Sequence, residues 1–293
     1  MCGRTGYAIG SRCCGGVGRR IGERFMHGIK TVGVVGAGQM GGGIAQVAAV
    51  SGLATVVYDA FAASIERCKA DHPKRMARLV EKGVMKQADA DAALSRLKYV
   101  PSLEALGACD IVIEAIVEDA QVKRELFVKL AEMFAKIPGE QILASNTSSI
   151  SITEIAAATR SIKGPTVAAQ EQVIGMHFFN PVPVMKLVEV IKGLTTSQRT
   201  TERTIALASA MGKTPIPAND RPGFVSNRVL MPMINEAFYA WMEGVAEPQH
   251  IDEIMKLGCN FPMGPLRLAD FIGLDTCVHI MDVLADGLNS DRY

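Results

Sequence analysis

A histidine and a glutamate are the first candidates for chemistry, because each lies in a short apolar run where a charged group is costly. His177 falls within QVIGMHFF (172–179), and Glu189 falls within VMKLVEVI (184–191). Both runs predict strands, and the turn at 180–183 would bring them side by side. A carboxylate that holds one imidazole nitrogen leaves the other nitrogen free to act as a base. The alternative is a core histidine bonded to backbone, with Glu189 facing solvent on an edge strand.

Small polar side chains follow another apolar run. The segment SNTSS (145–149) contains Asn146 and Ser148, and it would lie at the carboxyl edge of a parallel sheet, where ligands of such sheets bind. It is also typical of a helix N-cap cluster, because an amphipathic helix begins near Ser151. Asn227, in the first turns of a later helix, is either part of the site or a capping or surface amide.

A glycine-rich loop follows the first predicted strand and opens a helix. The motif is GxGxxG, formed by Gly36, Gly38, Gln39, Met40 and Gly41. Such glycines allow a tight turn, backbone approach to a pyrophosphate and close packing of helix on strand. Asp59 ends the next strand, 18 residues after Gly41, where a carboxylate binds the adenosine ribose and repels a 2′-phosphate. The pattern therefore predicts NAD, rather than NADP, as the cofactor.

The elements that must position these residues alternate in type. Short, β-branched runs predict strands at 31–35, 54–58, 110–115 and 141–145, and helical spacing predicts helices at 40–50, 61–82 and 119–136. This alternation indicates a Rossmann-type α/β fold with a doubly wound, mostly parallel sheet. After residue 191 we expect helices at 198–212, 222–244, 249–258 and 274–287, the first and third ending at the glycines Gly212 and Gly258.

Three prolines between Pro215 and Pro222 mark the best domain boundary. We therefore expect a leader at 1–28, an NAD-binding domain at 29–218 and a smaller all-helical domain at 219–293.

Composition narrows the class of protein. The 293 residues are 48% hydrophobic and 21% charged, with a formal net charge of +1, which is typical of a globular chain and gives no electrostatic case for nucleic acid. No apolar stretch is long enough for a membrane span. Seven cysteines without a CxxC pair predict no disulfide framework and no zinc site, and they favour a reducing compartment.

The first 28 residues differ from the rest. They hold five arginines, a single acid and many glycines, a composition that resembles a mitochondrial transit peptide. The alternatives are a mis-assigned start codon or a disordered arm, in which case we expect the protein in the cytoplasm.

Seven blocks in order resemble the 3-hydroxyacyl-CoA dehydrogenase family over residues 30–293. They are VGAGQMGGGIAQ, Asp59, VIEAIVED, ASNTSSISIT, GMHFFNPVPVMKLVEVI, DRPGFVSNR and FPMGPLRLADFIGLDT. The resemblance implies NAD-linked oxidation of an L-3-hydroxyacyl-CoA to the 3-ketoacyl-CoA, or the reverse reaction. It also implies a homodimer that forms through the helical domain, in fatty-acid or short-chain acyl-CoA metabolism.

By the same resemblance, His177 is the general base on the 3-hydroxyl and Glu189 orients it. Ser148 and Asn227 bind the reacting oxygen and His177. The remaining implied roles are cofactor contacts for Glu118, Lys123, Asn146 and Asn180, and a CoA phosphate contact for Lys82.

Two departures from the family pattern carry expectations of their own. Residues 163–171 make the spacing between Ser148 and His177 about eight residues longer than in the family, so they form either a surface loop or a shift of strand register that turns His177 away. The chain ends at 290–293, where family members continue to a Gly-rich motif with a lysine near the cofactor.

Two other functions compete with the dehydrogenase. A catalytically impaired, NAD-binding relative would serve a structural or interaction role. A dehydrogenase of small hydroxy acids would carry a catalytic lysine after the domain boundary, where this chain has Asn227 and Arg228.

Overall fold

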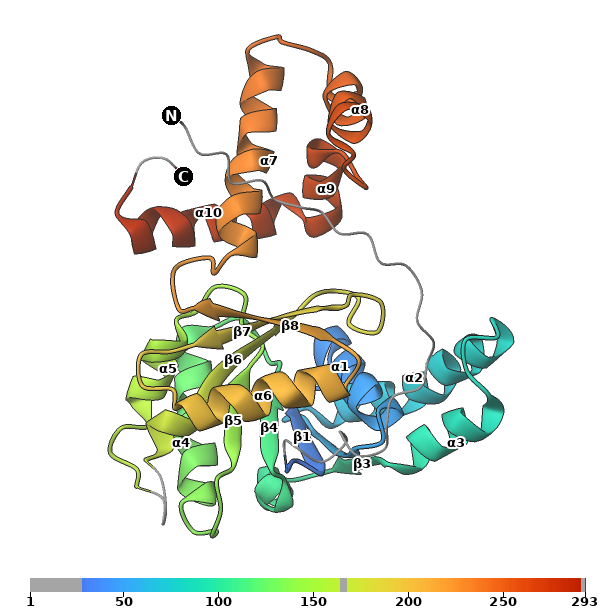
Figure 1. Ribbon diagram of the computed structural model, residues 1–293, viewed down its shortest axis with the longest axis vertical. Helices are drawn as coiled ribbons and strands as arrows, with labels where there is room; N and C mark the ends of the chain where they lie inside the picture. Colours follow the sequence, from blue (N-terminus) through green and yellow to red (C-terminus); the bar gives the residue numbers. More distant parts are fainter. Residues whose placement is uncertain (1–27, 164–167, 291–292) are drawn as a thin grey trace, which may run out of the picture.

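The computed structural model describes residues 28–163, 168–290 and 293. Except for Gly28, the predicted leader lies outside these residues. The described chain forms a sheet flanked by helices, with a group of four helices above it (Figure 1). The eight strands are β1 Thr31–Val35, β2 Ala54–Tyr58, β3 Leu97–Val100, β4 Ile111–Glu114, β5 Ile142–Ser145, β6 Val173–Phe178, β7 Leu187–Lys192 and β8 Thr214–Asn219.

The sheet has the strand order β3-β2-β1-β4-β5-β6-β7-β8. Strands β1 to β6 run parallel, β7 runs antiparallel to β6, and β8 runs parallel to β7. The predicted fold class, a mostly parallel α/β sheet followed by a helical C-terminal part, is confirmed.

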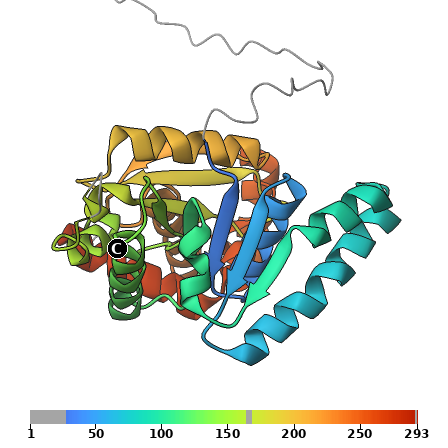
Figure 2. The ribbon, with the colours of Figure 1, turned by 90° about the horizontal axis from the view of Figure 1, so that it is seen from below.

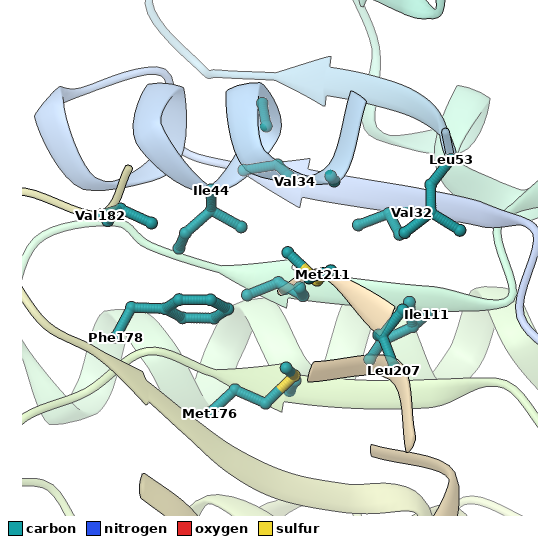
Figure 3. Packing of buried hydrophobic residues seen from close by; sticks show 14 of the residues in the cluster. Val32, Val34, Ile44, Leu53, Ile111, Met176, Phe178, Val182, Leu207 and Met211 are labelled. Atoms are coloured by element: carbon teal, nitrogen blue, oxygen red, sulfur yellow. The ribbon is translucent and has the colours of Figure 1, made fainter. Parts of the chain in front are cut away.

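Helices cover both faces of the sheet. They are α1 Gln39–Val50, α2 Ala62–Glu81, α3 Gln87–Ser95, α4 Ala120–Phe134, α5 Ile152–Ala158 and α6 Gln198–Ala210. Because side chains alternate along a strand, Ile111 and Ile113 of β4 pack in the cluster with α1 and α6, whereas Val112 packs in the cluster with α4 and α5. Figure 3 shows the first cluster, with Ile44 of α1 and Leu207 of α6. Helices α2 and α3 project to one side as an arm (Figures 1 and 2).

The helical part consists of α7 Ser226–Met242, α8 Pro248–Cys259, α9 Pro265–Ile272 and α10 Leu274–Leu288. It has its own small core, which includes Met231, Ile234, Ile280 and Leu284. None of the helices in the described ranges is long and apolar enough to cross a membrane.

The segment expected to mark the domain boundary, Pro215 to Pro222, begins inside the sheet. Residues 214–219 form β8, which pairs with β7 at the edge of the sheet. An edge strand needs hydrogen bonds on one side only, so it tolerates Pro215 and Pro217. The connection to the helical part therefore begins at Asp220 and ends before Ser226.

Several element boundaries also differ from the expectations. Strand β7 begins three residues later than predicted, because the N–H groups of Val184 and Met185 turn back to the Pro181 carbonyl. Helix α7 begins at Ser226 rather than at residue 222, after a turn at 222–225. Helix α6 ends at Ala210, two residues early, although Gly212 is left-handed as expected. Helix α8 continues through Gly258, and Asn260 takes the left-handed position with φ 58°.

The described cysteines are free thiols. Cys68, Cys109 and Cys277 are buried, and Cys259 is exposed. Burial raises the pKa of Cys68 to about 11 and that of Cys109 to about 12. These two are small core side chains rather than reactive groups.

Candidate active site

The glycine loop forms a tight turn between β1 and α1. Gly36 has φ 103°, and a Cβ there would lie 2.3 Å from the Ala115 carbonyl oxygen. A Cβ on Gly41 would lie 1.8 Å from the Gly36 carbonyl oxygen, whereas one on Gly38 would meet open space. Gly38 begins α1 without a side-chain cap. The first N–H groups of α1 are therefore left for an anion, and the open space at Gly38 lets a pyrophosphate approach the backbone.

Asp59 lies beside this loop at the end of β2. Its Oδ2 accepts from the Ala37 N–H at 2.7 Å, and its Oδ1 accepts from the Phe61 N–H at 2.8 Å. Each carboxylate oxygen has further lone pairs, so the side chain can still accept from ribose hydroxyls.

His177 and Glu189 face each other across the β6–β7 hairpin, where they are paired in register. His177 Nδ1 lies 2.8 Å from Glu189 Oε2, and both residues are buried, at 7% and 4% exposure. The aromatic rings of Phe179 and Phe224 lie 4.6 and 5.9 Å from the imidazole ring. Of the two interpretations of the sequence, the carboxylate–imidazole pair is the one that the structure contains.

The first turn of α7 also contacts Glu189. The Ser226 N–H donates to Oε1 at 3.0 Å, and the Ser226 hydroxyl donates to Oε2 at 2.9 Å. Burial raises the pKa of Glu189, but the hydrogen bonds and charge of His177 and the bonds from Ser226 outweigh burial and hold the pKa below its ordinary value. Glu189 is thus an ionised acceptor shared by the sheet and the helical part.

A second buried carboxylate, Glu114, lies at the end of β4. It is fully buried and accepts from Lys123 Nζ at 2.5 Å and from the Ser145 hydroxyl at 2.6 Å. Lys123 also lies 3.2 Å from Glu118. The sequence analysis missed Glu114, although the same signal that singled out Glu189, an acid inside an apolar strand, was present in DIVIEA.

Glu118 holds the loop that follows β5. Its Oε1 accepts from the Thr147 hydroxyl at 2.5 Å, from the Ser148 N–H at 2.8 Å and from the Ser149 N–H at 3.2 Å. Burial raises the pKa of Glu118, but the charge of Lys123 and these hydrogen bonds outweigh burial and hold the pKa below its ordinary value. The residues expected near the cofactor, Glu118 and Lys123, therefore form one ion-paired network under SNTSS.

The two predicted asparagines crosslink neighbouring segments. Asn146 Oδ1 accepts from the Phe178 N–H at 2.8 Å, at the end of β6. Asn180 Oδ1 accepts from Gln39 Nε2 at 2.9 Å, which joins the loop after β6 to the first turn of α1. Met40, next in α1, packs against the core.

Asn227 and Ser148 meet where α7 approaches this loop. Asn227 Nδ2 donates to the Ser148 carbonyl at 3.1 Å, and Asn227 is 8% exposed. Lys82 is not part of this cluster. It follows the last residue of α2, a helix of 20 residues and therefore about 30 Å long, on the projecting arm.

The longer segment before β6 does not displace His177. Helix α5 ends at Ala158 and β6 begins at Val173, and the parallel register Ser145↔Gly175 and the His177↔Glu189 pairing are both in place. The additional residues lie in the connection, of which 164–167 are outside the described ranges.

The interdomain connection is fixed to α5 by Asp220, a second residue that the sequence analysis missed. The Asp220 carboxylate accepts from the Ser151 hydroxyl and from the Thr153 N–H, both at 2.7 Å. Beside it, a cavity of about 370 Å³ opens between α10 and the loops that precede α4 and α5, lined among others by Glu118, Ser149, Asp220 and His279.

The carboxyl ends of β1, β2, β4, β5 and β6 thus bring together an uncapped helix N-terminus, the carboxylate of Asp59 beside the glycine loop and a buried histidine–carboxylate pair. This combination defines a dinucleotide-dependent dehydrogenase with a Rossmann-type sheet. More narrowly, the chain belongs to the 3-hydroxyacyl-CoA dehydrogenase family: the family's NAD binding domain matches residues 31–221, and its C-terminal domain matches residues 223–293. It is an NAD-dependent oxidoreductase of acyl-CoA metabolism.

Several relatives are similar over more than three quarters of their length. A protein named probable 3-hydroxybutyryl-CoA dehydrogenase from Deinococcus radiodurans is 53% identical over 89% of this chain and 90% of its own. The crystal structure of (S)-3-hydroxybutyryl-CoA dehydrogenase from Ralstonia eutropha matches with a TM-score of 0.82 and 49% identity, covering 90% of each chain. The human hydroxyacyl-coenzyme A dehydrogenase, mitochondrial, is 41% identical over 87% of this chain and 79% of its own.

Proposed function

We propose that His177 is the general base that takes the proton of the 3-hydroxyl of an L-3-hydroxyacyl-CoA. The observation that carries this assignment is the buried bond between His177 Nδ1 and Glu189. A carboxylate acceptor requires the Nδ1–H tautomer, so the lone pair of Nε2 is free to accept a proton. Glu189, kept ionised by its donors, stabilises the imidazolium that forms.

Bound NAD⁺ would supply the acceptor for the hydride that leaves carbon 3 of the substrate. The C3–H bond breaks with its electron pair, the hydroxyl proton passes to Nε2 of His177, and the carbon–oxygen bond becomes a carbonyl. Ser148 and Asn227 are proposed to hold the reacting oxygen and the imidazole. The hydrogen bond from Asn227 Nδ2 to the Ser148 carbonyl supports this, because it holds the two residues next to each other.

The remaining cofactor contacts follow the geometry of the carboxyl edge. Gly36, Gly38, Gln39, Met40 and Gly41 would cradle the pyrophosphate, and Asp59 the adenosine ribose. We place Glu118, Lys123, Asn146 and Asn180 near the nicotinamide half, because they order the loops after β4, β5 and β6. Lys82 on the arm is proposed to contact the phosphates of CoA.

The substrate that the relatives' names favour is 3-hydroxybutyryl-CoA. The test is consumption of NADH by the purified full chain with acetoacetyl-CoA, with NADPH as the paired control. NADH-selective turnover supports the proposal. A folded protein that binds NADH without turnover would favour the catalytically impaired relative instead.

The role of His177 has its own test. We expect His177→Gln to lower turnover by at least about a hundredfold, the usual contribution of a general base. The affinity for NADH should stay within a few-fold of wild type, because the glycine loop is untouched. Near-normal turnover of this variant would remove His177 from the mechanism.

We also propose a homodimer that forms through the helical part. An apolar groove of about 470 Å³ lies between α7 and α10, lined among others by Phe238, Tyr239 and Val278. Trp241 and Met242 add exposed apolar surface on α7, at 47% and 77% exposure. Such surface is typical of protein contacts.

Sedimentation analysis of Tyr239→Glu tests this dimer. A charge in the contact should yield monomers at concentrations where the wild type is dimeric. Val122→Glu, which adds the same charge at an exposed apolar residue on α4 of the sheet part, is the matched control away from the helical part. Unchanged sedimentation of Tyr239→Glu would place the contact elsewhere.

The Arg-rich composition of residues 1–28 supports a mitochondrial matrix location, and cytoplasmic function is the alternative. A fluorescent protein fused behind residues 1–28 should enter mitochondria of a eukaryotic cell. A diffuse cytoplasmic signal would contradict the targeting role.

A further inference from the structure

We propose that Ser226 is a positioning residue of the active site, which couples the first turn of the helical part to the basicity of the histidine–carboxylate pair. The proposal rests on the function proposed above, because it assumes that His177 is the base. Ser226 contacts His177 only through Glu189.

The two oxygens of Glu189 receive three donors in all. Oε2 accepts both from His177 Nδ1, at 2.8 Å, and from the Ser226 hydroxyl, at 2.9 Å, whereas Oε1 accepts from the Ser226 N–H, at 3.0 Å. Glu189 is only 4% exposed, so water does not readily replace a lost donor. The Ser226 hydroxyl and the imidazole therefore share one oxygen of a buried carboxylate.

Within the described part of the chain, the ring contacts of the imidazole and the sheet neighbour of Glu189 on β8 carry no charge. The rings of Phe179 and Phe224 contact the imidazole, and Ile216 of β8 lies opposite Glu189 in the sheet. The charge that acts on Glu189 from the surrounding elements is that of His177 itself. The Ser226 hydroxyl is a neutral donor on Oε2, the same oxygen that accepts from His177 Nδ1, so it acts directly on the atom that holds the imidazole.

A hydrogen bond to a carboxylate oxygen withdraws negative charge from that oxygen. Without the Ser226 hydroxyl, Oε2 becomes a better acceptor for the imidazolium, and the protonated form of His177 is favoured. The enzyme then needs a higher pH before the base is free. If Ser226 instead only held Glu189 in place, its loss would release the carboxylate, and the base would become free at a lower pH. The two roles move the pH profile in opposite directions.

The experiment measures kcat/KM for oxidation of 3-hydroxybutyryl-CoA by NAD⁺ as a function of pH. In Ser226→Ala we expect the midpoint of the acid limb to move to higher pH by about 0.5 to 1 unit, the scale of one lost charge-assisted bond at an oxygen that two donors share. Ser226→Thr, which keeps the hydroxyl, should retain the wild-type midpoint, and Ser226→Cys, a weaker donor, should fall between them. Unfolding curves establish that each variant is folded.

An NMR titration of the His177 imidazole in the free protein, assigned with His177→Gln, distinguishes the role of Ser226 from the role of His177 as the base. If the imidazole midpoint rises in Ser226→Ala while the kcat/KM profile stays, the coupling stands and the base assignment fails. If the imidazole midpoint is unchanged or falls, the proposal for Ser226 is overturned, whatever the base is.

Discussion

Glu114 and Glu189 are acids inside apolar strands, and each is stabilised by a different kind of partner. Glu114 is neutralised by the buried Lys123, whereas Glu189 is held by an imidazole and a serine. A charge removed from water is tolerated only where such partners are supplied. The sequence indicates that a partner must exist, and the fold determines which residue it is.

Removal of the charge of Glu114 should therefore be costly. We expect Glu114→Gln to lower the free energy of unfolding by about 3 kcal/mol, the lower end of the range for breaking a buried pair, because Lys123 retains Glu118 at 3.2 Å. Denaturant unfolding measures this loss. Glu125→Gln, on the exposed side of α4, is the control, and an equal stability of both variants would contradict the buried-pair argument.

Asp59 should determine the choice of cofactor. Since its carboxylate also holds the Ala37 N–H of the glycine loop, we expect Asp59→Ala to weaken NADH binding by about tenfold, or about 1.4 kcal/mol. The preference for NADH over NADPH should shrink, because the negative charge that repels a 2′-phosphate is gone. Fluorescence titration with both cofactors gives the ratio, and an unchanged ratio would place the ribose contact elsewhere.

Much of the site could be predicted at the level of single residues, since an acid or a glycine at a particular place has few physical explanations. The pairing of His177 with Glu189 followed from two strands and the turn between them. Ser226 and Asp220 could not be found in this way. A serine or aspartate near a helix start is commonplace, and only the folded chain shows that their partners lie on β7 and α5.

Among the elements, the strands of the sheet interior were predicted well, because they are continuously apolar. Strands β3 and β8 were missed, as were helices α3 and α9. Both strands lie at the edges of the sheet, where one side needs no partner, so LKYV and TPIPAN carry little of the apolar signal of a buried strand.

The turn between β1 and α1 offers a matched pair of variants. Gly41→Ala places a Cβ 1.8 Å from the Gly36 carbonyl, so it should force α1 away from β1 and lower both stability and NADH affinity, each by roughly 1 to 3 kcal/mol, the usual cost of overpacking. Gly38→Ala meets open space and should leave stability within about 1 kcal/mol while weakening NADH binding. Thermal unfolding and NADH titration distinguish them. Equal unfolding temperatures for the two variants would refute the close-packing role of Gly41.

For the whole molecule, the lowered pKa values of Glu118 and Glu189 mean that the folded protein loses stability in acid. Each carboxyl binds its proton less readily in the folded state, so its contribution is complete above the unfolded pKa of about 4.3. It is lost as the pH falls through the lower, folded value.

We therefore expect the unfolding free energy to decline below about pH 4.5. The decline should be shallower in Glu118→Gln, which has one fewer of these groups and is already less stable at neutral pH. Denaturant unfolding from pH 3 to pH 7 tests this. A slope in Glu118→Gln as steep as that of the wild type would mean that other groups dominate acid unfolding.

The antiparallel β6–β7 hairpin also separates two tasks along the chain. His177 and Glu189 reach each other across one short connection, so both members of the acid–base pair lie within the single segment 173–192. The arm, the helical part and the loops that meet there are encoded elsewhere. Substitutions in the arm and the loops can therefore alter what such an enzyme recognises without touching the acid–base pair, whereas a change at Ser226 in the helical part reaches that pair through Glu189.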